Sequence, residues 1–408
     1  MLLENNPYPQ DVRVRAEAES LARAGHRVTV VAPRDRAQPR SERVGGVDVV
    51  RFALPDGSTR GAGGFALEYL VASVALHRAA LRALLHGATV LHIHNPPDIF
   101  FPAGALYRLA GRRVIFDHHD LFPETVGVKF GAGPASRVAS WCQRMTFAVA
   151  DHVIATNESY AAVAREVGRK RREQVTIVRN GPPAAWTSLA ADGREGVLEQ
   201  IRLAYLGAIS SQDGVEGLAP VMARLCAGPD ALDVRLTVIG DGDARPALEA
   251  ALARNGVAER VTFTGWVAPA RVPELLAAAD LCVDPAPATD VNERSTMTKL
   301  AEYLALGKPV VAYDLLEARR TAGDAALLVP AGDVDAFAKA ISELARDPAL
   351  RHDFTRRARR RAIEELTWER SEQALFEAYA AVRTKPGPRR MRRLHRRSVG
   401  GRSLGRFS

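Results

Sequence analysis

The sequence predicts an α/β protein with two parallel β-sheets, and three observations lead to this fold class. Short runs rich in β-branched residues alternate with helical stretches through most of the 408 residues, which is typical of βαβ units. Several of these runs are apolar throughout, as expected of parallel strands that are covered on both faces. At about 150 residues per domain, the length favours two domains. We therefore expect two Rossmann-like domains that face each other across a cleft.

Strand-forming segments are spread over both halves of the chain. In the first half they are residues 27–32, 47–52, 89–94, 113–119, 152–156 and 175–180. The second half repeats the rhythm with residues 202–207, 234–240, 261–266, 281–286, 309–314 and 326–331. Between them lie amphipathic stretches that predict helices, such as residues 14–24, 214–226, 244–255 and 334–346, the last with Asp333 as its N-cap. The first strand, LLE, is unusually short, so we consider a true start upstream.

The domain boundaries follow from composition. A stretch rich in Gly, Pro and Ala predicts a linker at 183–200 between an N-terminal domain, 1–182, and a C-terminal domain, 201–365. Residues 366–383 predict a helix that packs back on the N-terminal domain. Residues 384–408 lack the apolar side chains that a core needs and predict a disordered basic tail. One large doubly wound sheet is the alternative, but domain size favours two.

The net charge of +9 belongs to the tail and not to the whole surface. Removing the nine basic residues after position 384 from the 56 Lys and Arg leaves 47, which equals the number of Asp and Glu. The body of the protein is therefore formally neutral, which argues against a nucleic-acid partner. A polybasic segment at 385–406 predicts contact with an anionic membrane surface. The nine residues are Lys385, Arg389, Arg390, Arg392, Arg393, Arg396, Arg397, Arg402 and Arg406.

The sequence also predicts where the protein resides. Its three cysteines, Cys142, Cys226 and Cys282, are far apart and form no C-x-x-C pair, which favours a reducing, cytoplasmic setting. The longest apolar helix candidate, residues 65–85, is interrupted by charged side chains and is not expected to span a membrane. We expect a cytoplasmic protein, with a peripheral position at the inner face of the plasma membrane as a further possibility.

Ligands of open α/β sheets bind beyond the carboxyl ends of the strands, so we searched there for chemistry. No G-x-x-x-x-G-K-[ST] occurs and no G-x-G-x-x-G follows a strand, which removes support for common ATP hydrolysis and nicotinamide chemistry. The segment 295–314 combines a loop with hydroxyl groups and a helix near whose start Lys299 and Glu302 share a face. In such a pair the cation could bind a diphosphate and the carboxylate could bind ribose hydroxyls, which suits a nucleotide-sugar. The alternative is a solvated Lys–Glu pair on a surface helix.

The segment AEYLALGKPVVAYD, at 301–314, resembles the donor-site motif of the retaining glycosyltransferases of family 4, which have the two-domain GT-B fold. Other segments agree with that family in order along the chain as far as about residue 380: NNPYPQDVRV, HIHNPPD, DHHDLFPE, TNESY, VRNGP, YLGAISSQDGV, VIGDGD and TFTGWV. The resemblance implies that the C-terminal domain binds a nucleotide-sugar donor and that the N-terminal domain binds the acceptor. It also implies a role in polysaccharide biosynthesis.

Donor-side residues carry over from the resemblance position by position. Glu302 resembles the ribose-binding glutamate, and the turn at 265–267 resembles the one that receives the base. The family often has a second glutamate eight positions earlier, where this chain has Arg294 beside Glu293. The loop at 207–215 also lacks the usual Arg and Lys, so we expect Lys299 to replace them. The donor-side set is Gly207, Gly214, Gly240, Gly265, Trp266, Val267, Glu293, Arg294, Ser295, Thr298, Lys299 and Glu302.

Acceptor-side residues are expected at the strand ends of the N-terminal domain. His119 resembles the histidine that lies beside the transferred sugar, and a structural histidine is the alternative. The loop after the first predicted strand contains a proline turn, for which an ordinary β-to-α turn is the alternative. The acceptor-side set is Asn6, Pro7, Tyr8, Asp11, Asn95, His118 and His119.

The expected activity is a retaining, hexosyltransferase-type transfer from a nucleotide-diphosphate sugar to a hydroxyl of a saccharide or lipid-linked acceptor. We expect His119, Lys299 and Glu302 to be the catalytic residues, with neither a metal nor another cofactor. Two alternatives remain open. A nucleotide-sugar epimerase or isomerase of the same architecture would need no acceptor. A metal-dependent hydrolase would use His92, His94, His118 and His119, with Asp117 and Asp120 as carboxylate ligands.

Overall fold

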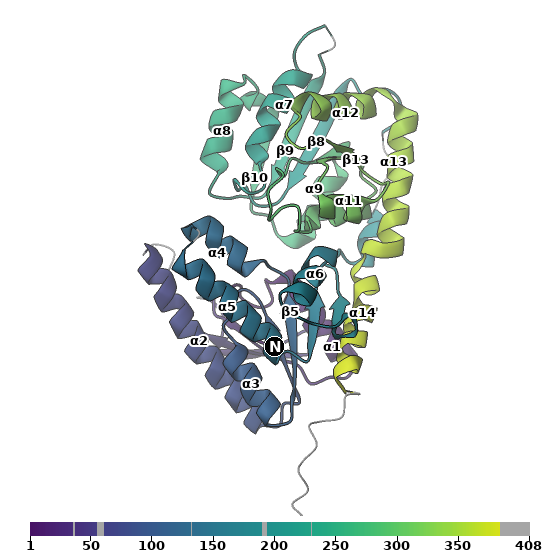
Figure 1. Cartoon of the computed structure of the whole chain (residues 1–408). Helices are drawn as coiled ribbons and strands as arrows, with labels where there is room; N and C mark the ends of the chain where they lie inside the picture. The colour runs from purple at the N-terminus through teal and green to yellow at the C-terminus, as the bar shows by residue number, and fades with distance from the viewer. Residues whose placement is uncertain (36, 55–60, 132, 190–193, 230, 384–408) are drawn as a thin grey trace, which may run out of the picture.

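The computed structural model confirms the α/β architecture with two domains, one above the other in Figure 1. It describes residues 1–35, 37–54, 61–131, 133–189, 194–229 and 231–383. The tail predicted at 384–408 lies outside the described residues. Within the described helices, none is both long and apolar enough to cross a membrane.

The sheet of the N-terminal domain is built on parallel strands. The order is β2-β3-β1, then β4-β5-β6-β7, and Leu2 joins the two parts through bridges to Val31 and Ile93. The predicted first strand is therefore reduced to a single bridging residue. Only β2 runs antiparallel to its neighbour. The strands are β1 (Thr29–Pro33), β2 (Ser41–Val44), β3 (Val47–Phe52), β4 (Val90–His94), β5 (Arg113–His118), β6 (His152–Ala155) and β7 (Val175–Ile177).

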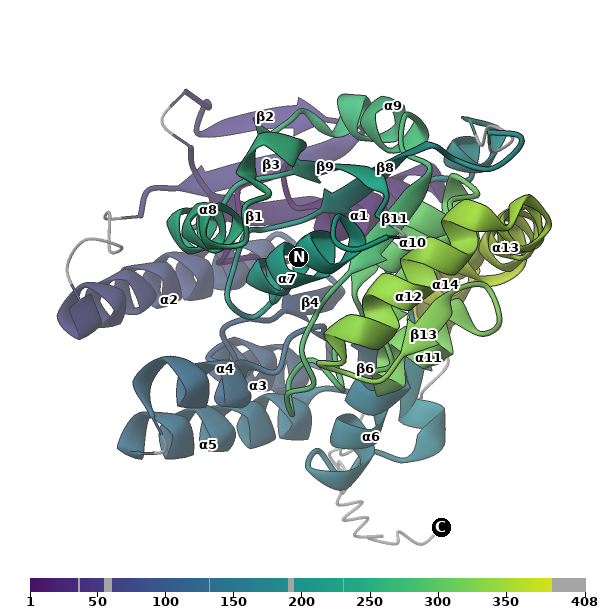
Figure 2. The ribbon, with the colours of Figure 1, turned by 90° about the horizontal axis from the view of Figure 1, so that it is seen from above.

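Helices cover both faces of this sheet. Asp11 begins α1 as its N-cap, because its carboxylate accepts a hydrogen bond from the Val14 N–H at 2.9 Å. Asn157 begins α6 in the same way. Figure 2 shows α2, α3 and α5 along one side of the domain. The helices are α1 (Val12–Arg23), α2 (Gly61–Leu85), α3 (Phe101–Leu109), α4 (Phe122–Phe130), α5 (Pro134–Val149) and α6 (Glu158–Glu166).

The sheet of the C-terminal domain is parallel throughout, in the order β10-β9-β8-β11-β12-β13. One core cluster joins it to α7, α8 and α12, and another joins its opposite face to α9, α10 and α11. In Figure 2, α8, α7 and α12 follow one another along one side of β9 and β8. The strands are β8 (Gln200–Leu206), β9 (Asp233–Ile239), β10 (Val261–Gly265), β11 (Leu281–Asp284), β12 (Val310–Tyr313) and β13 (Leu327–Val329). The helices are α7 (Leu218–Leu225), α8 (Arg245–Arg254), α9 (Val272–Ala277), α10 (Thr298–Ala305), α11 (Leu316–Ala322) and α12 (Val334–Arg346).

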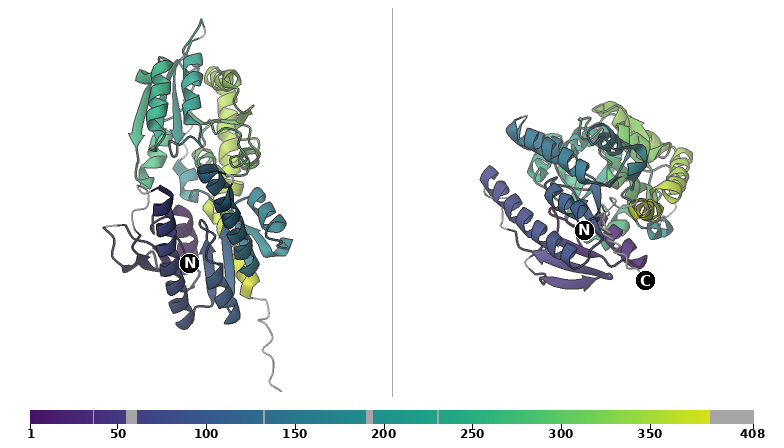
Figure 3. Two further views of the ribbon diagram at one scale, coloured as in Figure 1. Left: turned by 60° about the vertical axis from the view of Figure 1, so that its left-hand side comes forward. Right: turned by 60° about the horizontal axis from the view of Figure 1, so that its bottom comes forward.

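Two final helices return the chain to the N-terminal domain, as both views in Figure 3 show. α13 (Pro348–Arg361) packs on α10 and α12, a π-helical turn follows at Ala362–Leu366, and α14 (Trp368–Arg383) lies against α1, β5, β6 and β7. The Trp368 indole donates to the Ser20 hydroxyl at 3.0 Å. Leu375 and Val382, both fully buried, complete the core between the first sheet and α1. The N-terminal domain therefore depends on the last helix of the chain.

This dependence predicts the effect of truncating one side chain on α14. Leu375→Ala should lower the free energy of unfolding of the N-terminal domain by about 2–5 kcal/mol, because it leaves a cavity in that core. Urea unfolding followed by tryptophan fluorescence measures the change. Gln373→Ala, at an exposed position of the same helix, is the control and should shift the value by less than about 0.5 kcal/mol. Equal effects of the two substitutions would show that α14 is not part of the core.

Candidate active site

The carboxyl ends of the strands in the two domains meet at the boundary between them. Asn157, directly after β6, donates hydrogen bonds to the Arg294 carbonyl at 2.8 Å and to the Thr296 hydroxyl at 2.9 Å. The Tyr160 hydroxyl pairs with the Ser295 hydroxyl at 3.1 Å. The loop between β11 and α10 is thus bonded to the end of the first sheet. Two predicted donor-side residues, Arg294 and Ser295, lie at this boundary.

A buried carboxylate strengthens the same boundary. Glu317 on α11 is fully buried and accepts hydrogen bonds from the Ser159 N–H at 3.1 Å and the Ser159 hydroxyl at 2.6 Å. The Arg320 guanidinium also donates to Glu317, at 2.5 Å, which balances its charge. On the far side of the loop, Arg294 forms an ion pair with Glu124 at 3.3 Å. Side chains of both domains therefore hold the loop that precedes α10.

Glycines allow the strand-end loops of the C-terminal domain to approach closely. Gly240, which follows β9, donates its N–H to the Gly265 carbonyl at 3.1 Å. A Cβ atom on Gly240 would lie 2.0 Å from the Gly207 carbonyl oxygen, which no side chain could tolerate. At Gly214, with φ of 63°, a Cβ would lie 2.7 Å from Pro287. Gly207, Gly214 and Gly240 thus have a packing reason to be glycine, whereas Gly265, with φ of 66°, has only a backbone reason. The role of all four toward a donor stays a prediction.

Lys299 is not the free cation that the sequence suggested. Its ammonium group donates to Asp213 at 2.7 Å and to the Tyr205 hydroxyl at 3.1 Å, and it lies 3.6 Å from Asp284. The side chain is 7% exposed. Burial alone would lower the pKa of Lys299, but Asp284, Tyr205 and Asp213 outweigh it and raise that pKa. Its charge is therefore balanced within its own domain, by Asp213 on the loop after β8 and by Asp284 at the end of β11.

The start of α10 has no side-chain cap. Its N-cap residue, Met297, makes no side-chain hydrogen bond to the helix, and in the first turn the Leu300 N–H donates to the Met297 carbonyl at 3.0 Å. Glu302 follows one turn later, is partly buried, and forms no hydrogen bond through its carboxylate to any described residue. Burial raises its pKa to about 7, and Lys299 opposes this shift. The amino end of a helix, which favours an anion, thus lies beside an acceptor of hydrogen bonds, and the binding of a donor there stays a prediction.

The other predicted donor-side residues lie in two places. Glu293 accepts a hydrogen bond from the Leu316 N–H at 2.7 Å and so caps the start of α11. Thr298, at the start of α10, is exposed. Trp266 is 77% exposed after β10, and Val267 packs on the second core cluster of this domain. Glu293, on the loop before α10, therefore has a structural role at the start of α11, which the sequence pattern did not indicate.

His119 follows β5 and rests on two buried residues. Its Nδ1 atom lies 3.4 Å from the Asp117 carboxylate. The Asn95 side-chain oxygen accepts the N–H groups of His119 and Asp120 at 2.8 and 3.1 Å, and the Asn95 amide donates to the Asp120 carbonyl at 2.8 Å. Asn95 is fully buried. Its side chain is therefore used to hold the backbone of the loop after β5, and its role toward an acceptor stays a prediction.

Two further residues predicted on the acceptor side, His118 and Tyr8, have buried side chains, so the structure gives no support to contact with an acceptor. His118 packs between Phe147 and Tyr160, on the face of the sheet opposite to His94. Burial lowers the pKa of His118 to about 3, so this imidazole is neutral. The Tyr8 ring lies in the core of the N-terminal domain, and only its carbonyl is used, by Arg51 at 2.8 Å.

The remaining residues of the first loop stay near the surface. Asn6 is exposed and donates to Asp11 at 3.1 Å, while the Pro7 carbonyl accepts the Asp11 N–H. Asp11 is at the same time the N-cap of α1. This loop is therefore an ordinary strand-to-helix turn in its hydrogen bonds. Its role toward an acceptor stays a prediction.

Sequence reasoning missed Arg13 and Glu17, which lie on the buried face of α1. Arg13 donates two hydrogen bonds to Asp117, at 2.7 and 2.8 Å, and contacts Glu17 at 3.1 Å. The i,i+4 spacing of opposite charges on the apolar face of a predicted helix was the available signal. Glu17 in turn faces His92 and His94. The histidine set of the hydrolase alternative is therefore not assembled, since His118 lies on the other face of the sheet.

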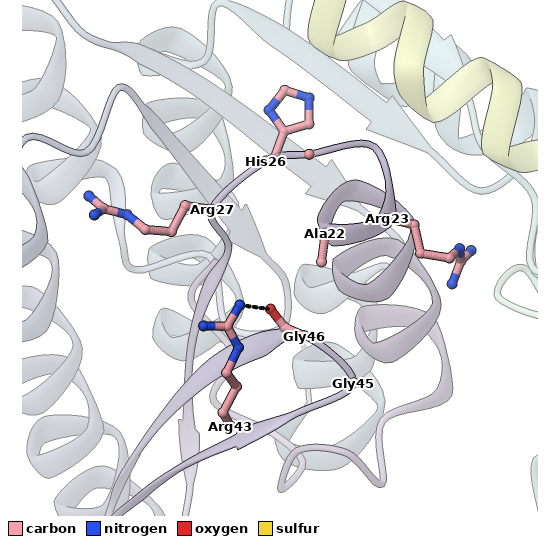
Figure 4. A pocket seen from close by; sticks show the side chains of 8 residues that line it. Ala22, Arg23, His26, Arg27, Arg43, Gly45 and Gly46 are labelled. Atoms are coloured by element: carbon pink, nitrogen blue, oxygen red, sulfur yellow. Dashed lines mark hydrogen bonds between the residues drawn. The ribbon is translucent and has the colours of Figure 1, made fainter.

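A basic hollow lies at the opposite edge of the first sheet, away from these residues (Figure 4). Its volume is about 440 Å³. It adjoins the amino ends of β1 and β3, and one of its arginines, Arg23, pairs with Glu372 of α14. None of the predicted site residues contributes to it. The lining residues are Ala22, Arg23, Gly25, His26, Arg27, Arg43, Gly45 and Gly46.

Comparison with known proteins relates both domains to glycosyltransferases. The family model described as "Glycosyl transferase 4-like domain" matches residues 10–181, and "Glycosyl transferases group 1" matches residues 200–347. The alpha-maltose-1-phosphate synthase of Mycolicibacterium smegmatis is 28% identical over 82% of this chain and 88% of that protein. The alpha-D-kanosaminyltransferase of Streptomyces kanamyceticus is 27% identical over 40% of this chain. The chain spans 42% of that relative, and 35% of the 2-deoxystreptamine N-acetyl-D-glucosaminyltransferase of Streptomyces fradiae.

Solved structures agree in fold. The sucrose-phosphate synthase of Thermosynechococcus elongatus has a TM-score of 0.67 at 20% identity, over 93% of this chain and 98% of that one. Anabaena Alr3699/HepE in complex with UDP has a TM-score of 0.69 at 18% identity, over 93% and 99%. Neither the epimerase nor the hydrolase alternative finds support among these proteins. Because the two family models match both domains in order, the chain belongs to the glycosyltransferases of family 4 and has their GT-B fold.

Proposed function

We propose that this chain transfers a hexosyl group from a nucleoside-diphosphate sugar to a hydroxyl of a saccharide or lipid-linked acceptor, with retention of configuration. The observation that carries this proposal is the hydrogen-bonded junction between Asn157 or Tyr160 and the loop at 294–296. It joins the start of α10, with Glu302, to the sheet edge that bears His119. Donor and acceptor groups are thereby brought to one boundary.

The donor side of the proposal rests on α10. The Glu302 carboxylate accepts the ribose hydroxyls, and the N–H groups at the start of α10 bind the diphosphate. The exposed Trp266 and the neighbouring Val267 receive the base. Anabaena Alr3699/HepE has been solved with UDP and with UDP-glucose, which supports a nucleoside-diphosphate sugar as the donor.

The structure changes the expected role of Lys299. Because Asp213 and Asp284 balance its charge, Lys299 acts as a positioning residue that holds the loop after β8 and the end of β11. The Arg294 side chain is 37% exposed, forms an ion pair with the partly exposed Glu124 at 3.3 Å, and donates from Nε to the Asp290 carbonyl at 3.1 Å. It is the better source of positive charge for a diphosphate, because it belongs to the junction loop itself and can reach a ligand by giving up its ion pair with Glu124.

The transfer step needs no nucleophile from the protein. The bond from the anomeric carbon to the diphosphate oxygen breaks, and the acceptor oxygen forms its bond on the same face. The acceptor proton passes to the departing phosphate oxygen, so the charges balance without a metal. The α10 terminus stabilises the leaving diphosphate, and His119, held by Asp117, orients the sugar.

Retention is tested on the product. With an α-linked nucleoside-diphosphate hexose and a suitable saccharide acceptor, we expect an α-linked product in the first turnover. Proton NMR of the anomeric signal distinguishes the two configurations before any later equilibration. A β-linked product would show inversion and would contradict the proposed step.

The raised pKa of Glu302 predicts a pH dependence of donor affinity. An ionised carboxylate accepts ribose hydroxyls better than a neutral one, so the affinity for UDP should rise as the pH increases through about 7. We expect a gain of up to about tenfold between pH 6 and pH 8, measured by calorimetry. Glu302→Gln should bind more weakly and lack this gain, which separates it from the titration of the nucleotide itself. Glu302→Ala should abolish turnover.

The raised pKa of Glu302 also predicts how its substitution changes the stability of the fold. Since the folded protein favours the neutral carboxyl, the contribution of Glu302 to stability is present below its ordinary pKa of 4.5 and is lost as the pH rises through about 7. At pH 8, Glu302→Gln should therefore be at least as stable as the unchanged protein. Unchanged turnover in Glu302→Ala would overturn the assignment of this residue.

We propose further that the segment 385–406, outside the described residues, holds the protein at the inner face of the plasma membrane. Each basic residue close to an anionic surface contributes about 1 kcal/mol. Sedimentation with vesicles that contain phosphatidylserine should recover the full chain at low salt and leave a chain ending at residue 383 in solution. UDP binding should be the same for both chains. Equal sedimentation of the two would remove this role of the segment.

A further inference from the structure

A group of metal-binding side chains is enclosed in the N-terminal domain, apart from the donor side of the boundary. Glu17 on α1 and His92 and His94 on β4 are 0–1% exposed. The Nε2 atoms of His92 and His94 lie 3.8 and 3.9 Å from Glu17 Oε2. None of these three atoms has a hydrogen-bond partner among the described residues. Three buried polar atoms without hydrogen-bond partners therefore lie together, with both Nε2 atoms within 4 Å of Glu17 Oε2.

The opposite nitrogen of each histidine is already held. His94 Nδ1 lies 3.0 Å from Asp117 Oδ2, and His92 Nδ1 lies 2.9 Å from the Tyr379 hydroxyl of α14. The two rings stack with centroids 4.2 Å apart. Such contacts on Nδ1 fix an imidazole and leave Nε2 as the free donor, which is the arrangement found around metal-ligating histidines.

The charges of the group favour a cation. Arg13 donates two hydrogen bonds to Asp117 and also contacts Glu17, so one guanidinium serves two buried carboxylates. With both carboxylates ionised, one negative charge is left without compensation inside the protein, which is costly. Two neutral imidazoles facing that carboxylate can stabilise a positive ion and cannot stabilise the anion by themselves.

We propose that Glu17 Oε2, His92 Nε2 and His94 Nε2 bind a divalent cation, with zinc as the best match to two imidazoles and a carboxylate. Ligand atoms about 2.1 Å from a tetrahedral ion are about 3.4 Å apart, so the present spacings of 3.8 and 3.9 Å need to close by about 0.4 to 0.5 Å. The ion is structural. It ties α1 to β4 and, through Tyr379 and Asp117, to α14 and β5, and it takes no part in sugar transfer.

A water molecule is the competing occupant. It would donate to both Nε2 atoms and accept a hydrogen bond from a protonated Glu17. The two occupants differ in what Glu17→Gln does, because an amide can replace a protonated carboxyl but is a poor ligand for zinc.

The test uses the full chain purified without a polyhistidine tag from cells grown with added zinc. Elemental analysis by mass spectrometry should find about one equivalent of zinc. Unfolding in the presence of EDTA should lower the Tm by about 4 °C or more relative to a buffer with zinc. Glu17→Gln should retain less than about a tenth of an equivalent, and its Tm should no longer respond to zinc.

His152→Ala is the matched control, since His152 is also a buried histidine on a strand of this sheet but is not part of the group. It should keep the full zinc content even where it lowers the Tm. The proposal would be overturned if the unchanged chain contained less than about a tenth of an equivalent of zinc and its Tm were the same with zinc and with EDTA. A Glu17→Gln variant as stable as the unchanged chain in that case would identify water as the occupant.

Discussion

The N-terminal domain is built around the buried ion pair between Arg13 and Asp117. Through it, α1 is bonded to β5, and Arg13 also donates to the Val178 carbonyl and to Asn180 beyond β7. Burial alone would raise the pKa of Asp117, but the Arg13 guanidinium, helped by His119, holds it well below its usual range. Removing one partner would leave a buried charge, at a cost of about 3–5 kcal/mol.

The same ion pair also reaches the boundary between the domains, because Asp117 contacts the loop after β5. Asp117 lies under His119, and Asn95 fixes the backbone of the same loop from the neighbouring strand. On the other side, Asn157 and Tyr160 hold the loop that leads into α10. The strand ends of the two sheets thus position the side chains on both sides of the boundary. On the N-terminal side, α14 completes the core beneath those strand ends.

Much of the fold could be predicted because strands and helices are encoded by apolar runs and by patterns among neighbouring residues in the sequence. The missed strand, β2, reads SERV and is an exposed edge strand without an apolar face. The strand-end rule directed attention to the residues after β5, but it could not tell which neighbour faces inward, and His118 proved buried. The partners of Lys299 lie 86 and 15 residues away in sequence, on the loop after β8 and at the end of β11, whose meeting depends on the whole sheet. The capping role of Glu293 depends in the same way on the position of α11.

The proposed transfer requires a nucleoside diphosphate to bind at the start of α10, against the boundary of the two domains. A crystal structure with UDP tests it most directly. We expect the ribose within hydrogen-bond distance of Glu302, the diphosphate at the first N–H groups of α10, and the base beside Trp266. UDP bound elsewhere, for example in the basic hollow of Arg23, Arg27 and Arg43, with the start of α10 unchanged, would contradict the account.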